Sequence, residues 1–96
     1  MSFSQASLDR IRAELAEVPP VNPEFDVYLS SDEIRTRYLW HEGIEIACRN
    51  GQYVCTRRLE RSTRTQVLEE ESQAVDLFIR VAGSQKQARI LSSADI

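Results

Sequence analysis

The residues of this sequence that could carry out acid–base, nucleophilic or metal chemistry are few and lie apart. His41 is the single histidine, and the cysteines are Cys48 and Cys55. A zinc site needs about four Cys or His ligands, so these three residues do not supply one. No serine stands in a nucleophile-elbow pattern, and the scattered glycines form no phosphate-binding loop. We therefore expect no catalytic residues, no cofactor and no metal site, and we place His41 in an exposed turn.

The densest basic cluster of the chain has four arginines: Arg57, Arg58, Arg61 and Arg64. Guanidinium groups bind carboxylates and phosphates through paired hydrogen bonds, so the cluster could hold an acidic protein or a phosphate backbone. Alternatively, it is a solvated turn that is balanced by Glu60 and by acidic residues of the adjacent strand. The sequence leaves both interpretations open.

An acidic run, Glu69, Glu70 and Glu71, follows the arginines. It precedes a predicted helix, where negative charge interacts favourably with the helix dipole. The run therefore has a structural explanation, and a surface for a partner is the alternative. Strand pairing is expected to bring it near the arginines, so we select both groups as candidate partner-binding residues.

Composition indicates one small globular domain over residues 1–96. The chain has 42% hydrophobic and 28% charged residues and a net charge of −3. No apolar stretch approaches the roughly 18 residues that cross a bilayer, and the first residues do not resemble a signal peptide. We expect a cytoplasmic protein that does not enter a membrane. Its acidic balance argues against general nucleic-acid binding, which depends on neutralising phosphates.

A first helix is predicted over residues 1–18. Its apolar residues recur at helical spacing: Leu8, Ile11, Leu15 and Val18. Ser4 is a suitable N-cap for this helix. Pro19 and Pro20 end it, because proline cannot continue a helix, and residues 19–32 are expected to form a connector.

Residues 33–70 are predicted to form an antiparallel β-meander of three or four strands. Asn50 and Gly51 tolerate positive φ, which a two-residue type I′ hairpin turn requires at both positions. This turn sets the register as Arg49 with Gln52, Cys48 with Tyr53, and Ile46 with Cys55. Cys48 and Cys55 then lie diagonally, about 7–8 Å apart, which exceeds the usual span of a disulfide. We expect two free cysteines packed as small apolar side chains.

Residues 33–40 carry two conflicting patterns. Ser30 and Glu33 match a capping box at the start of a helix. In contrast, apolar and polar residues alternate along the segment, which is typical of a strand. We favour the strand, because a three-residue loop over 41–43 then places Gly43 in the left-handed conformation that such loops require. The resulting register is Trp40 with Ile44 and Tyr38 with Ile46.

The C-terminal part is predicted to add a strand and a helix. Residues 65–69 supply the fourth strand, and residues 72–83 show an apolar stripe at helical spacing. Ser72 is the expected N-cap, Gly83 is the expected residue just after the helix, and residues 84–96 form a tail. The predicted fold class is therefore α+β, with an N-terminal helix, an antiparallel meander and a C-terminal helix packed on the sheet.

Three stretches of the chain resemble small immunity proteins of bacterial polymorphic toxin systems. They are RYLW at residues 37–40, GQYVCTRR at 51–58 and ESQAVDLF at 71–78. In such proteins a β-meander runs into a closing helix, and the domain blocks a toxin by covering its active site. The resemblance spans roughly half of the chain and implies an inhibitor that binds a protein partner.

The expected function is protein binding without catalysis, most concretely as an immunity or antitoxin-like inhibitor of a cognate toxin. One alternative is a small nucleic-acid-binding regulator that uses the arginine cluster, and another is a secretion chaperone. The sequence does not indicate the identity of the partner or the oligomeric state.

Overall fold

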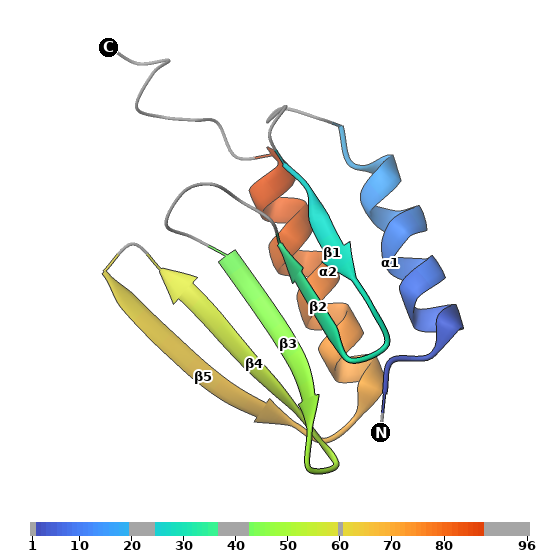
Figure 1. The fold of residues 1–96 in the computed structure, drawn as a ribbon. Coiled ribbons are helices and arrows are strands. Elements are labelled where there is room, and N and C mark those ends of the chain that lie inside the picture. The colour runs from blue at the N-terminus through green and yellow to red at the C-terminus, as the bar shows by residue number, and fades with distance from the viewer. Residues whose placement is uncertain (1, 20–24, 37–42, 60, 88–96) are drawn as a thin grey trace.

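The structure, a computed structural model, describes residues 2–19, 25–36, 43–59 and 61–87. Within these residues the chain forms two helices and five strands (Figure 1). The elements are α1 (Gln5–Glu17), β1 (Val27–Leu29), β2 (Glu33–Thr36), β3 (Gly43–Arg49), β4 (Gln52–Leu59), β5 (Ser62–Leu68) and α2 (Glu71–Gln87). The strands pair in chain order as an antiparallel sheet. This confirms the predicted α+β fold, with one strand more than predicted.

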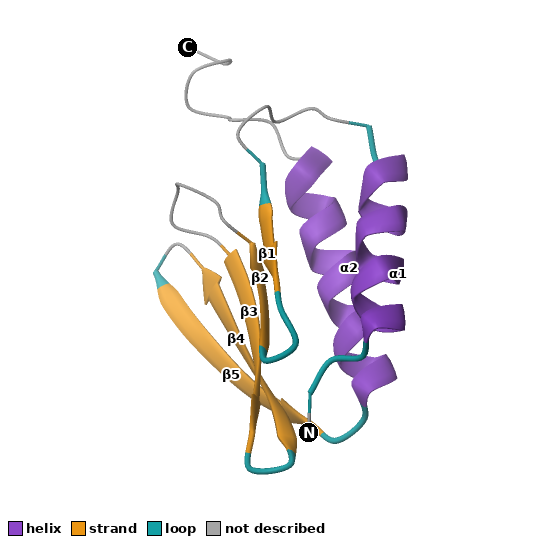
Figure 2. Cartoon of the chain, turned by 45° about the vertical axis from the view of Figure 1, so that its right-hand side comes forward, coloured by secondary structure: helices purple, strands orange, loops and turns teal. Residues whose placement is uncertain are grey.

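Both helices lie on the same face of the sheet and run in the same direction (Figures 1 and 2). α2 contacts the sheet, chiefly the central strand β3, and α1 packs against α2. The core between these layers contains Phe3, Leu8, Ile11, Leu15, Ile34, Ile44, Ile46, Tyr53, Cys55, Ala74, Val75, Phe78, Val81 and Ala82. Among the described residues, no helix covers the other face of the sheet, which we call the open face (Figure 2).

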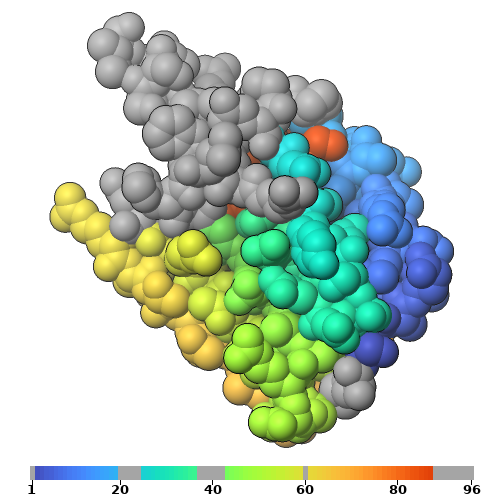
Figure 3. Space-filling model, in the orientation of Figure 1, coloured from blue at the N-terminus to red at the C-terminus, as the bar shows by residue number. Residues whose placement is uncertain are grey.

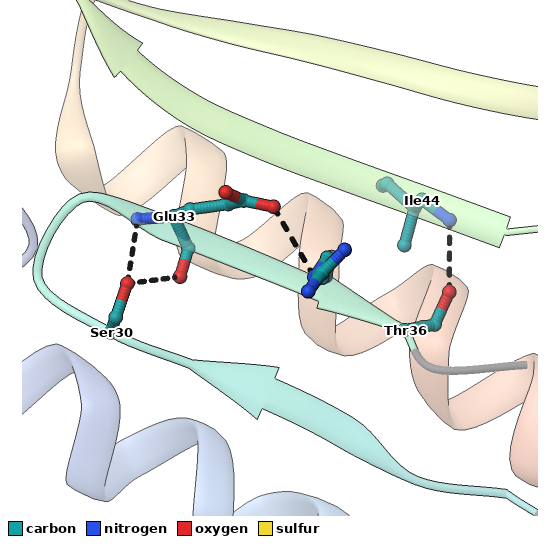
Figure 4. A network of polar contacts seen from close by, with 5 residues as sticks. Ser30, Glu33, Thr36 and Ile44 are labelled. Atoms are coloured by element: carbon teal, nitrogen blue, oxygen red, sulfur yellow. Dashed lines mark hydrogen bonds and ion pairs between the residues drawn. The ribbon is translucent and has the colours of Figure 1, made fainter.

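The predicted connector between α1 and the sheet contains a strand, β1, which the sequence analysis missed. β1 pairs with β2 in antiparallel register. Ser30 closes this hairpin, because its Oγ accepts a hydrogen bond from the Glu33 N–H at 3.1 Å and donates one to the Glu33 carbonyl at 3.0 Å (Figure 4). A serine hydroxyl can bond the local backbone at a helix start or in a turn. The apparent capping box is therefore a turn between two strands.

The strand predicted before β3 is confirmed over β2, but its predicted register is wrong. Ile34 lies opposite Ile46, in the place predicted for Tyr38. The shift from position 38 to position 34 is even, so the same face of the strand stays toward the core. Thr36 Oγ1 accepts a hydrogen bond from the Ile44 N–H at 3.0 Å (Figure 4). Thr36 of β2 therefore lies beside the start of β3, where the prediction placed Trp40.

The loop predicted over residues 41–43 lies only in part within the described residues. Gly43 begins β3 and has no positive φ, so its predicted left-handed conformation is wrong. Trp40 and residues 41–42 lie outside the described residues, and so does the predicted pairing of Trp40 with Ile44.

The β3–β4 hairpin is confirmed in detail. Asn50 and Gly51 have φ values of 50° and 75°, as a type I′ turn requires. The observed register has Arg49 opposite Gln52, Cys48 opposite Tyr53, and Ile46 opposite Cys55. The turn residues alone were sufficient to predict this register.

The β4–β5 hairpin is longer than predicted. Leu59 pairs with Ser62, so the fourth predicted strand begins at Ser62 and not at residue 65. The polar residues that suggested a loop therefore belong mostly to the strands, because exposed hairpin strands accept polar side chains on both faces.

The α2 helix also exceeds its predicted bounds. It begins at Glu71, so Ser72 is not its N-cap, and it continues for another turn past Gly83. The prediction that Gly83 lies after the helix end is therefore wrong. Lys86 explains the extra turn, because its Nζ donates a hydrogen bond to the Leu15 carbonyl of α1 at 2.6 Å.

Gly83→Ala is expected to raise the free energy of unfolding by about 0.5–1 kcal/mol, because glycine is a weak helix former. A Cβ there would meet Val18 Cγ2 at 3.7 Å and Leu15 Cδ2 at 3.9 Å, which are ordinary van der Waals distances. Gly51→Ala is the contrasting variant and should cost about 1 kcal/mol, because a left-handed conformation disfavours an L residue. Chemical denaturation measures both changes. A destabilised Gly83→Ala variant would contradict a helix running through position 83.

Candidate functional site

The predicted arginine cluster gathers at the turn end of the β4–β5 hairpin, which projects from the body of the molecule in yellow (Figure 3). Arg57 and Arg64 are direct cross-strand partners, and Arg58 faces Thr63. Neighbouring strand residues point to opposite faces, so Arg58 lies on the open face, whereas Arg57 and Arg64 lie on the helix-bearing side. All four arginines, including Arg61 beside the turn, are exposed. We call these four residues the arginine end.

No carboxylate neutralises the arginine end within the part of the chain that the structure describes. The ion pairs found there join other residues, and the predicted balancing residue Glu60 lies outside the described residues. Like charges directly opposite each other in a sheet are destabilising, and Arg57 and Arg64 have this arrangement. The arginine end is therefore a concentrated positive surface.

The acidic run lies at the other end of β5, so the prediction that the two charged groups are neighbours is wrong. β5 ends at Leu68, and a strand of this length extends about 20 Å. Glu69 and Glu70 are exposed, whereas Glu71 is half-buried in the first turn of α2. Two of the three acidic candidates are thus fully exposed, and the third is partly covered by its contacts with other elements of the fold.

The Glu71 carboxylate joins three distant parts of the chain. The Ser4 hydroxyl donates to Oε2 at 2.7 Å, the Ser4 N–H donates at 3.2 Å, and the Ser7 hydroxyl donates to the same oxygen. The Tyr53 hydroxyl of β4 donates to Oε1 at 3.4 Å. The donors from Ser7, and then Ser4, favour the charged form and lower the pKa of Glu71. Sequence reasoning missed this network, because no local pattern links residues 67 positions apart.

The residues before α1 are fixed in the same region. Ser4 caps α1 as predicted, because its Oγ accepts a hydrogen bond from the Ser7 N–H at 3.2 Å. The Phe3 N–H donates to the Ser31 carbonyl at 2.7 Å, and the Phe3 and Tyr53 ring centroids are 5.2 Å apart. The start of the chain therefore contacts both the β1–β2 turn and β4.

The described residues with chemical reactivity are the two cysteines. Both cysteines are free, with Cys55 buried and Cys48 half-buried. Burial raises the pKa of each thiol, which is the opposite of what a nucleophilic thiolate needs. His41 lies outside the described residues. Among the residues that are described, no three His, Cys, Asp or Glu side chains are placed to hold a metal ion.

A second polar group, which the sequence analysis did not select, lies on the open face of the sheet. Arg35 pairs with Glu33 at 3.3 Å, and its guanidinium carbon lies 4.9 Å from the centroid of the Tyr28 ring. Burial, and then the neighbouring Glu45, raise the pKa of Glu33. Finding this group required β1, which was not predicted, and the β2–β3 register, which was predicted incorrectly. Its charges compensate one another, unlike those of the arginine end.

No known protein family, curated protein or solved structure matches this chain. In the described residues, neither helix is long and apolar enough to cross a membrane. We therefore infer the function from the geometry and charge of the surface.

Glu71→Gln is expected to lower the free energy of unfolding by about 1–2 kcal/mol near neutral pH, because the serine donors lose a charged acceptor. The pKa of Glu71 is lowered in the fold. Its carboxylate therefore stabilises the protein above the ordinary glutamate pKa, and this contribution is lost as the pH falls through the lowered value.

Denaturation of the wild type and the variant at a series of pH values measures this effect. Glu70→Gln is the control, because Glu70 is exposed, and it should change stability by less than about 0.5 kcal/mol. A Glu71→Gln difference that does not shrink in acid would exclude the carboxylate as its source.

The two thiols are expected to react at different rates with an aromatic disulfide reagent. Cys48 is half-buried and should react first, whereas Cys55 is buried and should react only after the protein unfolds. In denaturant both should react quickly. Equal fast rates in the native protein would contradict the burial of Cys55, and no reaction in denaturant would contradict the free state of both thiols.

Proposed function

We propose that the chain is a non-enzymatic protein-interaction domain that inhibits a cognate protein in the manner of an immunity or antitoxin protein. In this proposal the arginine end binds acidic side chains of the partner. The observation that carries it is the like-charge pair of Arg57 and Arg64, which disfavours the isolated hairpin. Carboxylates of a partner would remove the repulsion and form bidentate hydrogen bonds with the guanidinium groups.

The shape of the hairpin supports this use. β4 and β5 stay in continuous register over seven residue pairs up to the turn, so the arginines are held on a regular support. A surface that is ordered before binding loses less conformational entropy in the complex. The hairpin projects from the body of the molecule (Figure 3), and its register places arginines on both of its faces. Such a projection can enter a recess of a partner, which is how one domain covers the active site of another.

A phosphate backbone is the competing ligand for the same arginines. The net charge of −3 opposes the approach of a polyanion, because nucleic-acid affinity depends on neutralising phosphates. Glu69 and Glu70 at the far end of β5 are exposed and add to this repulsion. We therefore favour an acidic protein surface as the ligand.

Arg57→Glu is expected to have opposite effects on stability and on binding. In the isolated domain it places a carboxylate opposite Arg64, which should raise the free energy of unfolding by about 0.2–1 kcal/mol. The same change should weaken partner binding by about tenfold or more, mainly through slower association. Arg80→Glu is the matched control, because Arg80 is exposed on α2, away from the hairpin, and it should affect neither property.

The partner is sought by affinity capture from the source organism with wild-type, Arg57→Glu and Arg80→Glu baits, followed by binding kinetics with the purified partner. The proposal expects a protein that wild type and Arg80→Glu retain and Arg57→Glu loses, and whose activity stops at equal stoichiometry. Equal capture by all three baits contradicts a role for the arginine end. Steep salt-dependent binding to generic DNA or RNA would instead identify a nucleic-acid ligand.

A further inference from the structure

β5 is the outer strand of the sheet, and no described strand pairs with its outer side (Figure 1). The Cys48 N–H donates to the Asp32 carbonyl at 2.9 Å. The backbone groups of Cys48 and of every second residue along β3 therefore point toward β2, and those of the residues between them point toward β4. The β3–β4 and β4–β5 registers carry the same alternation through β4 to β5. Three β5 residues consequently point their backbone N–H and C=O groups away from the sheet: Thr63, Thr65 and Val67.

This edge has few of the features that usually prevent such strands from pairing. β5 contains neither lysine nor proline, and its register with β4 is continuous, without a bulge. Every residue from Ser62 to Val67 is exposed, and Val67 is 49% exposed on the open face. The edge therefore offers both unpaired backbone groups and apolar surface to another strand.

We propose that a second copy of this chain occupies this edge, with the two β5 strands antiparallel and centred on Thr65. Thr65 then lies opposite Thr65 of the second copy, and Thr63 lies opposite Val67 of the second copy on each side of the centre. About six backbone hydrogen bonds close the interface. The Val67 methyl groups lose contact with water against Thr63 of the second copy, and the two sheets become one.

Charge selects this occupant and this register. Arg61 lies in the turn just before β5 and Glu69 lies just after it, both exposed, so a pair centred on Thr65 brings Arg61 near Glu69 of the second copy at both ends. Centring on Arg64 would place two guanidinium groups opposite each other, and a parallel pair would put like charges side by side. A second copy carries the complementary pattern by two-fold symmetry.

The two-fold arrangement does not block the rest of the molecule. α1 lies toward the β1 side of the sheet and α2 packs chiefly on the central strand β3 (Figures 1 and 2), so neither helix lies along the outer side of β5. Within the arginine end, Arg57 and Arg58 belong to β4, one strand inside the edge, and stay accessible, whereas Arg61 pairs with Glu69 of the second copy. Self-association therefore does not depend on the proposed inhibitor function, and either can fail without the other.

Sedimentation equilibrium over a concentration series tests the pairing. Thr65→Pro removes the central outward N–H and is tolerated, because proline is acceptable on an edge strand where the N–H faces solvent. Thr65→Ala keeps the N–H and is the control. We expect a dissociation constant about tenfold or more above wild type for Thr65→Pro and within about threefold for Thr65→Ala. A wild type that is monomeric at concentrations on the order of millimolar, or a folded Thr65→Pro variant that dimerises like wild type, overturns the proposal.

A charge swap tests the register independently of proline. Arg61→Glu and Glu69→Arg should each weaken the dimer by about tenfold, and the combined variant should recover it, because the pairs re-form with reversed signs. Failure of the combined variant to recover overturns the register. Amide hydrogen exchange supplies the location: the amides of Thr63, Thr65 and Val67 should exchange slowly in concentrated samples and quickly in dilute ones. Fast exchange at both concentrations in a dimeric sample places the interface elsewhere and overturns the proposal.

Discussion

The Glu71 carboxylate is the contact on which the relative position of the helices and the sheet depends. It is the first residue of α2, and it accepts hydrogen bonds from Ser4 and Ser7 at the start of α1 and from Tyr53 in β4. A carboxylate is stabilised in its charged form by several donors, and here the donors come from separate segments. This contact holds the start of α1 beside the start of α2, while the face of α1 that meets the core is the one that carries Leu8, Ile11 and Leu15.

The rest of the helix layer follows from two parallel helices lying side by side (Figures 1 and 2). Parallel helix dipoles place like partial charges together at each end. α2 supplies a compensating charge at both ends, with Glu71 at the N-terminus of α1 and Lys86 at the Leu15 carbonyl near its C-terminus. Arg10 and Asp76 pair across the middle at 2.7 Å. Exposed pairs contribute little energy, so the two ends, rather than the middle, fix the alignment.

Features set by neighbouring residues could be predicted from the sequence, and features set by distant contacts could not. The Asn50-Gly51 turn determines the β3–β4 register by itself, and the arginine end is one turn with its flanking strands. In contrast, the β2–β3 register differs from the predicted one by an even slip, which the hydrophobic pattern cannot detect. Gly83 resembles a local helix end, but packing of α2 against α1 overrides that signal.

The order of elements along the chain also affects how the protein folds while it is being synthesised. Each strand pairs with the one before it, so the sheet grows by short-range contacts that form quickly. α1 is the exception, because Ser4 and Leu15 form hydrogen bonds with α2 residues that lie 67 and 71 positions further along the chain. α1 leaves the ribosome before the strands and α2, so its apolar face has no partner helix until α2 follows. A nascent chain from which the strands have already emerged therefore still exposes the apolar face of α1.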